Sequence, residues 1–236
     1  MMALILAGGL GTRLASVLAD RPKTLAPAGG KPFVEHQLAQ LQRQGFTDVT
    51  LCVGHRAEQI QNELGNGGQL GVRLSYSVER QGLLGTAGAI RQAAGGLEAS
   101  FLVLNGDSYL ETDFPDLASF HRERRARDPS LAATIAAVEV DEAAAYGSLS
   151  LNGERKVTGF AEKGAVGPGW VNAGAYVLEP AILDLIPDGP VSLEQETFPL
   201  ALDFNLVIAA YPVAGFVDIG TPEGYRRFCE RVEVAG

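Results

Sequence analysis

The stretch Ala3-Leu4-Ile5-Leu6-Ala7-Gly8-Gly9-Leu10-Gly11-Thr12-Arg13-Leu14 decides how the chain begins to fold. Its first five residues are apolar, which predicts a strand buried on both faces, as in a parallel sheet. The glycines that follow let backbone N–H groups turn towards an anion without Cβ clashes. The planar guanidinium of Arg13 is suited to clamping phosphate oxygens. The spacing matches neither a Walker A loop nor a dinucleotide fingerprint, so the loop alone fits a plain strand-to-helix turn equally well.

Outward from this stretch, short apolar runs alternate with longer amphipathic segments. Strands are predicted over Val49–Val53, Val72–Val78 and Phe101–Leu104, and helices over Phe33–Gln44, Ala57–Leu64 and Thr86–Ala94. This alternation, with strands apolar on both faces, is typical of a parallel sheet covered by helices on both sides. Ligands of such sheets bind at the carboxyl ends of the strands.

The second half of the chain is less regular. Its pattern predicts a charged surface helix over Leu117–Arg127, strands over Leu131–Val140, Val171–Leu178, Leu206–Tyr211 and Phe216–Ile219, a hairpin of Ser148–Leu151 and Val157–Ala161 around Asn152-Gly153, and a short helix from Pro180. A last helix is predicted from Thr221, which suits an N-cap because Pro222 and Glu223 follow it. No internal repeat and no long polar linker interrupt the pattern, so one domain over residues 1–236 is the simplest interpretation.

Composition excludes several classes of protein. The 236 residues carry a formal net charge of −9, which argues against a nucleic-acid partner. Two cysteines and three scattered histidines give neither a disulfide scaffold nor a zinc site. No apolar run approaches the ~20 residues of a membrane-spanning helix. We expect a cytoplasmic protein, monomeric or homodimeric, with no membrane partner.

A second loop makes the glycine loop more specific. The segment Arg21-Pro22-Lys23-Thr24-Leu25-Ala26-Pro27 is stiffened by prolines and carries one lysine towards the same region. The two loops together resemble the signature of the sugar nucleotidyltransferases, the nucleoside-diphosphate-sugar pyrophosphorylases. The resemblance implies that the glycine loop wraps a nucleoside triphosphate and that Arg13 and Lys23 are catalytic.

Six further segments resemble the same family in its order: Gly85–Ile90, Asn105-Gly106-Asp107, Tyr146-Gly147-Ser148, Phe160–Lys163, Asn172-Ala173-Gly174 and Asp218–Glu223. The resemblance implies that Asp107 is catalytic and, with Asp218, binds Mg²⁺. It implies a nucleotide site of Leu6, Ala7, Gly8, Gly9, Gly11, Thr12, Arg13, Lys23, Glu79, Gly85 and Thr86. It implies a sugar-phosphate site of Gly147, Glu162, Lys163 and Asn172.

The subgroup that the chain resembles most is the guanylyltransferases acting on D-glycero-α-D-manno-heptose 1-phosphate, followed by those acting on mannose 1-phosphate. The run Pro22–Phe33 and the strand Ser75–Glu79 support this. The segment Arg80–Leu84 departs from it, being one residue longer than the family's loop beside the base. We therefore expect GTP as the triphosphate. The runner-up is UTP with another sugar 1-phosphate, such as that of N-acetylmuramic acid or glucose.

The resemblance implies a Rossmann-like three-layer α/β sandwich with a mostly parallel central sheet and a β-rich sugar-binding insertion. Residues 1–110 would form mainly the nucleotide-binding half and residues 111–236 mainly the sugar-phosphate half. Two other classes remain: a non-catalytic nucleotide-sugar sensor, and a glycosyltransferase of similar architecture. The sensor has no need of both aspartates. The glycosyltransferase would need an Asp-x-Asp motif, which Asp107-Ser108-Tyr109 does not supply.

Overall fold

The computed structural model describes residues 1–14, 18, 21–144, 147–161 and 167–235. Contacts within the chain divide it into two compact units, neither of them continuous in sequence. Unit 1 consists of Met1–Leu83, Leu104–Tyr109 and Val217–Gly236, and unit 2 consists of Leu84–Val103 and Leu110–Phe216. The division into halves at residue 110 stays a prediction about function.

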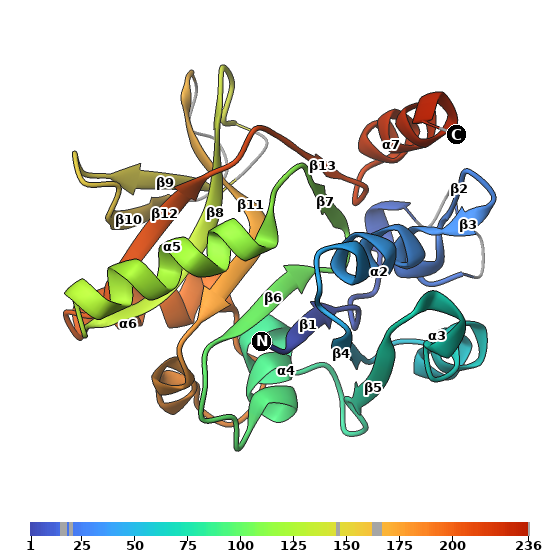
Figure 1. The fold of residues 1–236 in the computed structure, drawn as a ribbon, viewed down its shortest axis with the longest axis horizontal. Helices are drawn as coiled ribbons and strands as arrows, with labels where there is room; N and C mark the ends of the chain where they lie inside the picture. The colour runs from blue at the N-terminus through green and yellow to red at the C-terminus, as the bar shows by residue number, and fades with distance from the viewer. Residues whose placement is uncertain (15–17, 19–20, 145–146, 162–166, 236) are drawn as a thin grey trace. The chain divides into compact units, whose positions relative to one another are not determined.

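Unit 1 alternates strands with helices along its first 83 residues (Figure 1). Its elements are β1 (Ala3–Leu6), η1 (Thr12–Leu14), η2 (Lys23–Leu25), β2 (Pro27–Ala28), β3 (Lys31–Pro32), α2 (Phe33–Arg43), β4 (Asp48–Val53), α3 (Ala57–Leu64), η3 (Gly68–Leu70), β5 (Arg73–Val78) and α7 (Pro222–Ala235). Three strands contribute residues to both units: β6 (Phe101–Asn105), β7 (Ser108–Leu110) and β13 (Phe216–Asp218).

The sheet of unit 1 is parallel. β1 pairs with β4 in the register Ala3–Val49, and β4 pairs with β5 in the register Asp48–Arg73. β1 and β4 are largely buried and mainly apolar, as expected of strands covered on both faces, whereas β5 alternates apolar and polar residues and is more exposed. The carboxyl end of β1 therefore leads directly into the glycine loop.

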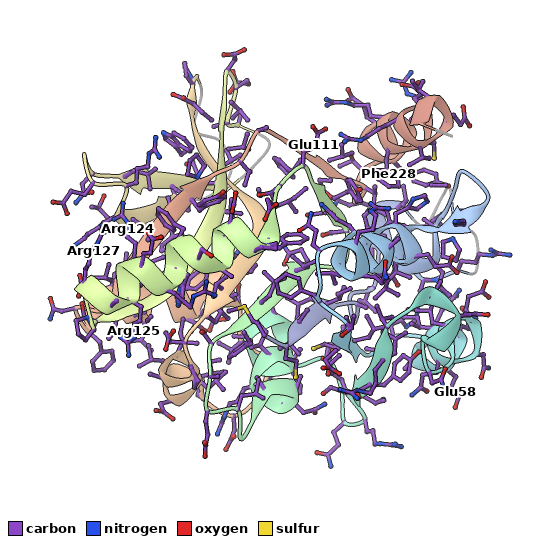
Figure 2. All side chains as sticks on the ribbon, in the orientation of Figure 1. Glu58, Glu111, Arg124, Arg125, Arg127 and Phe228 are labelled. Carbon is purple, nitrogen blue, oxygen red and sulfur yellow. The ribbon has the colours of Figure 1, made fainter. Side chains whose placement is uncertain are left out.

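Helix α7 forms a second core of unit 1 around Phe228, labelled in Figure 2. The Phe228 ring packs edge-on against Phe33, with centroids 4.8 Å apart, and also against Tyr109 at 5.3 Å. Thr221 caps the helix, because its Oγ1 accepts from Gly224 N at 3.1 Å, as the sequence predicts. Helix α7 is thus fixed to unit 1 directly after the Asp218 segment.

Unit 2 contains α4 (Gly85–Ala94), α5 (Phe114–Arg127), β8 (Leu131–Val140), β9 (Ser148–Leu151), β10 (Val157–Ala161), β11 (Gly169–Leu178), η4 (Pro180–Leu185), the π-helical turn η5 (Leu193–Thr197), α6 (Phe198–Asp203) and β12 (Val207–Pro212). β12 pairs with β8 in parallel. β8 and β9 each pair with β11 in antiparallel fashion, and β10 pairs antiparallel with β9. This is where the β-rich insertion is predicted. The α/β class with a mostly parallel central sheet is confirmed.

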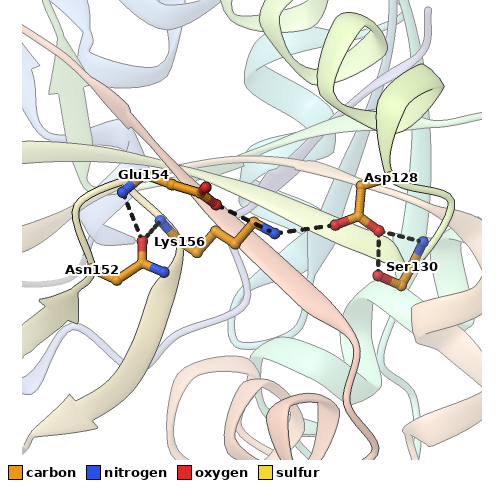
Figure 3. Close-up of polar contacts among 5 residues, drawn as sticks. All are labelled: Asp128, Ser130, Asn152, Glu154 and Lys156. Atoms are coloured by element: carbon orange, nitrogen blue, oxygen red, sulfur yellow. Dashed lines mark hydrogen bonds and ion pairs between the residues drawn. The ribbon is translucent and has the colours of Figure 1, made fainter.

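The predicted hairpin exists with the predicted strand bounds, and its connecting loop is longer than a two-residue turn. β9 ends at Leu151 and β10 begins at Val157. Figure 3 shows how the loop is held: Asn152 Oδ1 accepts from the backbone N–H groups of Glu154 and Lys156, each at 3.0 Å. Lys156 Nζ also lies 3.3 Å from Asp128 Oδ2. The asparagine side chain, acting in place of a two-residue turn, closes this loop.

Helix α5 begins earlier than the sequence pattern predicts. Asp113 caps it by accepting from Asp116 N at 2.9 Å, so the helix starts at Phe114, not at Leu117. Of its arginines labelled in Figure 2, Arg124 lies over the Phe120 ring, and Arg125 donates to Leu131 O at 3.1 Å and lies 3.6 Å from Glu179 Oε2. Arg127 is exposed. None of the helices in the described part of the chain is long and apolar enough to cross a membrane.

Candidate functional site

The residues predicted for the site divide between the two units. Unit 1 holds Leu6, Ala7, Gly8, Gly9, Gly11, Thr12, Arg13, Lys23, Glu79, Asp107 and Asp218. Unit 2 holds Gly85, Thr86, Gly147 and Asn172. Glu162 and Lys163, like Tyr146, lie outside the described residues.

The glycine loop of unit 1 lies against the second predicted loop. Gly11 has φ +63°, and a Cβ at this position would lie 3.1 Å from the Cβ of Lys23. A side chain would be strained by the positive φ and crowded by the lysine, so glycine is required here. Earlier in the loop, Gly8 O accepts from His55 N at 3.3 Å. The glycine loop and Lys23 are thus brought together, as the sequence indicates.

Lys23 forms an ion pair with Asp107, although 84 positions separate them. Lys23 Nζ lies 2.5 Å from Asp107 Oδ2, and the two side chains are only 17% and 23% exposed. Lys23 belongs to the short helix η2, and Asp107 follows β6. Such a partly buried, charge-assisted contact holds two mobile side chains in one arrangement.

Arg13 and Asp218 join this pair around Gly220. A Cβ on Gly220 would lie 2.8 Å from Asp218 Oδ1, 2.9 Å from Arg13 Nη2 and 3.4 Å from Asp107 Oδ2. Three charged groups therefore reach within 3.4 Å of one point that only a glycine leaves open. We call Arg13, Lys23, Asp107 and Asp218 the charged cluster.

The charged cluster perturbs the ionisation of Asp218. Burial raises the pKa of its carboxyl above the ordinary value, and the neighbouring Asp107 charge raises it further. A hydrogen bond from Gly220 N at 2.6 Å and the cations Lys23 and Arg13 act in the opposite direction without cancelling the rise. Two carboxylates facing each other are a site that an added cation would stabilise.

The donor set of this site suits a hard divalent cation. Mg²⁺ keeps an octahedral oxygen shell and is commonly held by one or two carboxylates together with substrate phosphates. Asp107 and Asp218 supply two carboxylates. Within residues 1–14, 18, 21–144, 147–161 and 167–235, no group of three or more His, Cys, Asp and Glu residues is arranged to hold a metal. The residues thus fit a cation whose remaining ligands come from phosphate and water.

The turn that carries Asp107 is tied to two other segments of unit 1. Gly106 N donates to Leu6 O at 3.0 Å, and Ile219 N donates to Asp107 O at 2.8 Å. A Cβ on Gly106 would lie 2.3 Å from Leu6 O, so the turn approaches β1 more closely than any side chain permits. These bonds join the first strand, Asp107 and the Asp218 segment.

Glu79 lies beside the start of the glycine loop. Its Oε1 would be 2.2 Å from a Cβ on Gly8 and 3.2 Å from one on Gly54. Two glycines therefore make room for this carboxylate. Its charge, after burial, raises the pKa of the Cys52 thiol to about 12. Glu79 follows β5, so a charged acceptor stands next to the loop predicted to hold the nucleotide.

Unit 2 places Gly85 and Thr86 against the segment before η5. A Cβ on Gly85, where φ is +71°, would lie 2.4 Å from Val191 O. Thr86 Oγ1 accepts from Leu193 N at 2.7 Å and lies 3.1 Å from Glu194 Oε2. An ionised carboxylate can only accept, so the Thr86 hydroxyl donates to it. The hydroxyl hydrogen is then used within the protein, so towards a nucleotide the Thr86 side chain could only accept a hydrogen bond.

Glu194 links Thr86 to Asn172. Tyr176 OH donates to Glu194 Oε1 at 2.7 Å and accepts from Asn172 Nδ2 at 2.8 Å. Asn172 Oδ1 accepts from Gly174 N at 2.9 Å, so both ends of the amide have a partner and its orientation is set. We call Thr86, Asn172, Tyr176 and Glu194 the Glu194 network.

Gly147 contacts strand β11, on which Asn172 lies. Its carbonyl accepts from Asn172 N, with the two atoms 3.5 Å apart. Two predicted sugar-phosphate residues of unit 2 are therefore neighbours.

Three residues with structural links to the predicted site are missing from the sequence prediction. Tyr176 and Glu194 belong to the Glu194 network, and Gln37 contacts the backbone on both sides of the Asp107 turn. Gln37 lies in an ordinary helical pattern, and Tyr176 is read as a strand residue. Glu194 follows Ser192, whose Oγ accepts from Gln195 N at 3.1 Å. That capping signal predicts a helix start but no partner for the carboxylate.

The chain matches a known protein family and a solved structure over nearly its whole length. The family model described as "Nucleotidyl transferase" matches residues 2–233. The crystal structure of HddC from Yersinia pseudotuberculosis complexed with GMP-PN superposes with a TM-score of 0.84 at 34% sequence identity, covering 98% of both chains.

Curated relatives are similar over most of this chain. "Probable mannose-1-phosphate guanylyltransferase 1" of Oryza sativa subsp. japonica is 39% identical over 234 residues, and "Mannose-1-phosphate guanylyltransferase" of Mycobacterium tuberculosis is 36% identical over 230 residues. Each alignment covers 95% of this chain. The chain spans 63% and 62% of the length of these two relatives, respectively.

Proposed function

Since this chain belongs to the nucleotidyl transferase family, we propose that it is a sugar-1-phosphate guanylyltransferase. It would join GTP to a sugar 1-phosphate of the mannose or heptose type, giving a GDP-sugar and pyrophosphate. The observation that carries this proposal is the charged cluster of unit 1, in which Arg13, Asp107 and Asp218 reach one point beside Lys23.

In this reaction the protein stabilises charge and positions the substrates, and it forms no covalent bond to them. An oxygen of the sugar phosphate attacks the α-phosphorus of the triphosphate, and the bond from that phosphorus to the bridging oxygen breaks as pyrophosphate leaves. The attacking oxygen is already ionised at neutral pH, so no general base is required. The protein has to bring two anions together and neutralise the charge that grows on the leaving group.

Arg13 and Lys23 are suited to the leaving group. The exposed Arg13 guanidinium offers a planar fork for phosphate oxygens, and the Lys23 ammonium offers a compact charge. The ion pair with Asp107 holds Lys23 beside the glycine loop before substrate arrives. Gly8, Gly9 and Gly11 leave backbone N–H groups of the loop unobstructed for the phosphates.

We propose Mg²⁺ as the metal, held by Asp107 and Asp218. The cation would neutralise negative charge on the bound phosphates. Asp107 is fixed by its turn and Asp218 by the Gly220 N–H. The two carboxylates would therefore be presented in a preorganised arrangement, which is what electrostatic stabilisation of a transition state requires.

The sugar phosphate is assigned to Gly147, Glu162, Lys163 and Asn172. Asn172 has a set amide orientation, so it would offer a sugar hydroxyl one defined donor and one defined acceptor. Glu162 and Lys163 enter from their motif alone. Lys163 would hold the incoming phosphate by its charge.

Glu79 supports guanine as the base. Guanine presents an N1–H and a 2-amino group as donors, and a carboxylate is an acceptor for both. Glu79 occupies the space that Gly8 and Gly54 leave, directly beside the glycine loop. HddC, with which the chain superposes, was crystallised with GMP-PN, and the curated relatives carry guanylyltransferase names. We place the enzyme in the cytoplasm, where GTP is available.

A substrate matrix tests the proposal. GTP, UTP, dTTP, CTP and ATP are each combined with mannose, heptose, glucose and N-acetylmuramic acid 1-phosphates, and pyrophosphate release is measured at equal concentrations. We expect turnover with GTP and a mannose- or heptose-type phosphate, and none in EDTA. A preference for UTP or dTTP would overturn the guanylyl assignment. Absence of turnover in the whole matrix would indicate a nucleotide-sugar sensor.

A further inference from the structure

Helix α2 places a glutamine directly behind the turn that carries Asp107. Gln37 is 1% exposed, and its Nε2 donates to Asn105 O at 2.9 Å and to Ser108 O at 2.8 Å. One amide group therefore spends both of its hydrogens on two backbone carbonyls. These carbonyls stand immediately before and immediately after Gly106-Asp107.

The two bonds define the span of the turn. Asn105 ends β6 and Ser108 begins β7, so the chain turns at the two residues between them. With both carbonyls bound to one nitrogen, the ends of this turn cannot move apart without breaking one of the two hydrogen bonds. The contacts of Gly106 with Leu6 and of Asp107 with Ile219 fix the middle of the turn. The backbone of the Asp107 turn is therefore held by Gln37, by Leu6 O and by Ile219 N.

Stability alone does not favour glutamine at this position. Its Oε1 is buried and has no hydrogen-bond partner among the described residues, and leaving a buried polar atom unsatisfied is destabilising. The amide is nevertheless useful, because the Asn105 and Ser108 carbonyls would lose a buried donor without it. The two Nε2 hydrogens of Gln37 hold the turn, and the amide that provides them leaves its Oε1 without a hydrogen bond among the described residues.

We propose that Gln37 is a positioning residue for Asp107. Through the carbonyls of Asn105 and Ser108 it sets where the Asp107 carboxylate stands relative to Lys23 and Asp218. This inference rests on the proposed function, in which Asp107 holds the metal. A displacement of about 1 Å in such a group can cost on the order of 10²-fold in rate, so a residue that touches no substrate can still control turnover.

The same helix offers a matched control. Gln40 is also buried, at 7% exposure, and lies three positions further along α2. Gln37→Met and Gln40→Met make the same chemical change, from an amide to an unbranched apolar side chain of similar length. Any loss that comes merely from an altered helix core should appear in both variants.

Two measurements are made on the full chain. In metal-free protein, amide hydrogen exchange of the segment 104–109 is compared among wild type, Gln37→Met and Gln40→Met. In steady-state assays with GTP and the accepted sugar 1-phosphate, kcat and both KM values are determined. For Gln37→Met we expect faster exchange of that segment and a kcat lower by about 10- to 100-fold, with KM values within about twofold. For Gln40→Met we expect neither change.

A second variant applies if Gln37→Met does not fold. Gln37→Glu keeps the shape, but the carboxyl can donate a hydrogen bond only when protonated. Its kcat per folded enzyme, relative to wild type, should therefore rise as the pH is lowered, and circular dichroism at each pH separates this rise from a change in the amount of folded protein. A ratio that is flat with pH would contradict the proposal.

The outcomes separate this inference from the proposed function. If wild type releases no pyrophosphate with any triphosphate, the proposed function fails, and the exchange measurement still decides whether Gln37 holds the turn. If wild type is active but Gln37→Met keeps its kcat within about twofold, the positioning role is wrong. Equal effects of Gln37→Met and Gln40→Met on exchange and kcat would also overturn it.

Discussion

The charged cluster of unit 1 and the Glu194 network of unit 2 both contain carboxylates, but they use them differently. In the charged cluster, Asp107 and Asp218 face each other, and the pKa of the Asp218 carboxyl is raised. In the Glu194 network, hydroxyl groups of Tyr176 and Thr86 donate to the two carboxylate oxygens. In the first arrangement two neighbouring carboxylates disfavour each other's charge, which an added cation would relieve, and in the second both carboxylate oxygens accept internal hydrogen bonds.

This difference teaches how the two units would divide the work. Fixed charged groups and a bound cation interact strongly with charge that develops in a transition state, so the charged cluster should govern kcat. A satisfied hydrogen-bond network fixes shape, so the Glu194 network should govern the binding of a substrate through the orientation of Asn172. Substitutions in the two regions should separate in their kinetic signatures.

The largest effect is expected from Asp107→Ala. Loss of this carboxylate removes one of two proposed metal ligands and leaves Lys23 without its partner. We expect kcat to fall by about 10²–10³-fold or more while the fold survives. Pyrophosphate release and circular dichroism measure the two properties. EDTA should abolish the activity of the wild-type enzyme. A robustly active Asp107→Ala enzyme would contradict the proposal that Asp107 and Asp218 together bind the metal.

Glu79→Gln sharpens the comparison, because this carboxylate of unit 1 lies beside the glycine loop and should control selectivity more than rate. An amide supplies one acceptor and one donor where the carboxylate supplies acceptors only. Loss of a charged hydrogen bond to guanine should reduce the preference for GTP over UTP by about tenfold or more. The ratio of kcat/KM values for the two triphosphates measures this. An unchanged ratio would assign base recognition elsewhere.

Tyr176→Phe tests the Glu194 network. The change removes the hydroxyl that accepts from Asn172 and donates to Glu194. We expect the KM of the sugar 1-phosphate to rise by about fivefold, with kcat and the KM of GTP changed by less than about twofold. Tyr211→Phe on β12 is the control, since the Tyr211 ring packs against Phe120 outside this network. A kcat defect as large as that of Asp107→Ala would erase the distinction between the two regions.

The smallest effect concerns stability in metal-free buffer. The pKa of the Asp218 carboxyl is raised in the folded protein, so the folded state binds this proton more tightly than the unfolded state does. Stability is then lost as the pH rises from the ordinary carboxyl range through the raised pKa. Asp218→Asn should therefore raise Tm at neutral pH, by on the order of 2 °C, and this gain should vanish near about pH 4.

Thermal unfolding of wild type and Asp218→Asn at the two pH values measures this. A Tm gain that is as large at low pH as at neutral pH would show that charge repulsion is not its cause.

Much of the fold follows from local patterns. The parallel strands β1 and β4 are short, mainly apolar runs, β5 alternates apolar and polar residues, and α2, α3 and α7 have apolar residues at helical spacing, so periodicity predicts them directly. The errors lie where a side chain outside the pattern acts. Asp113 caps α5, so the helix begins at Phe114, ahead of the predicted start at Leu117. The predicted bounds of the hairpin match β9 and β10, but the pattern does not predict that the Asn152 side chain closes the loop. The helical region Leu193–Asp203 is absent from the sequence prediction.

The candidate site is predictable to a different extent. The glycine loop, Lys23, Asp107 and Asp218 stand in recognisable segments, and the structure brings them together in unit 1. The roles of these residues and of Glu162 and Lys163 stay predictions. Gln37, Tyr176 and Glu194 could not be found from sequence, since each lies in an ordinary helical or strand pattern and matters only through a distant partner.

The sequence by itself determined which charged residues are present and where each lies relative to a helix or strand. An arginine and a lysine lie in loops, and two aspartates lie near the ends of strands. These are properties of short segments, which local sterics and periodicity control. Only the tertiary structure decided that Asp107 meets Lys23 across 84 positions, that Gly220 leaves room for Arg13 beside two carboxylates, and that Gln37 spans the turn behind them. The reason is physical: a hydrogen bond or an ion pair depends on distances of about 3 Å, and packing alone sets these distances between distant parts of a chain.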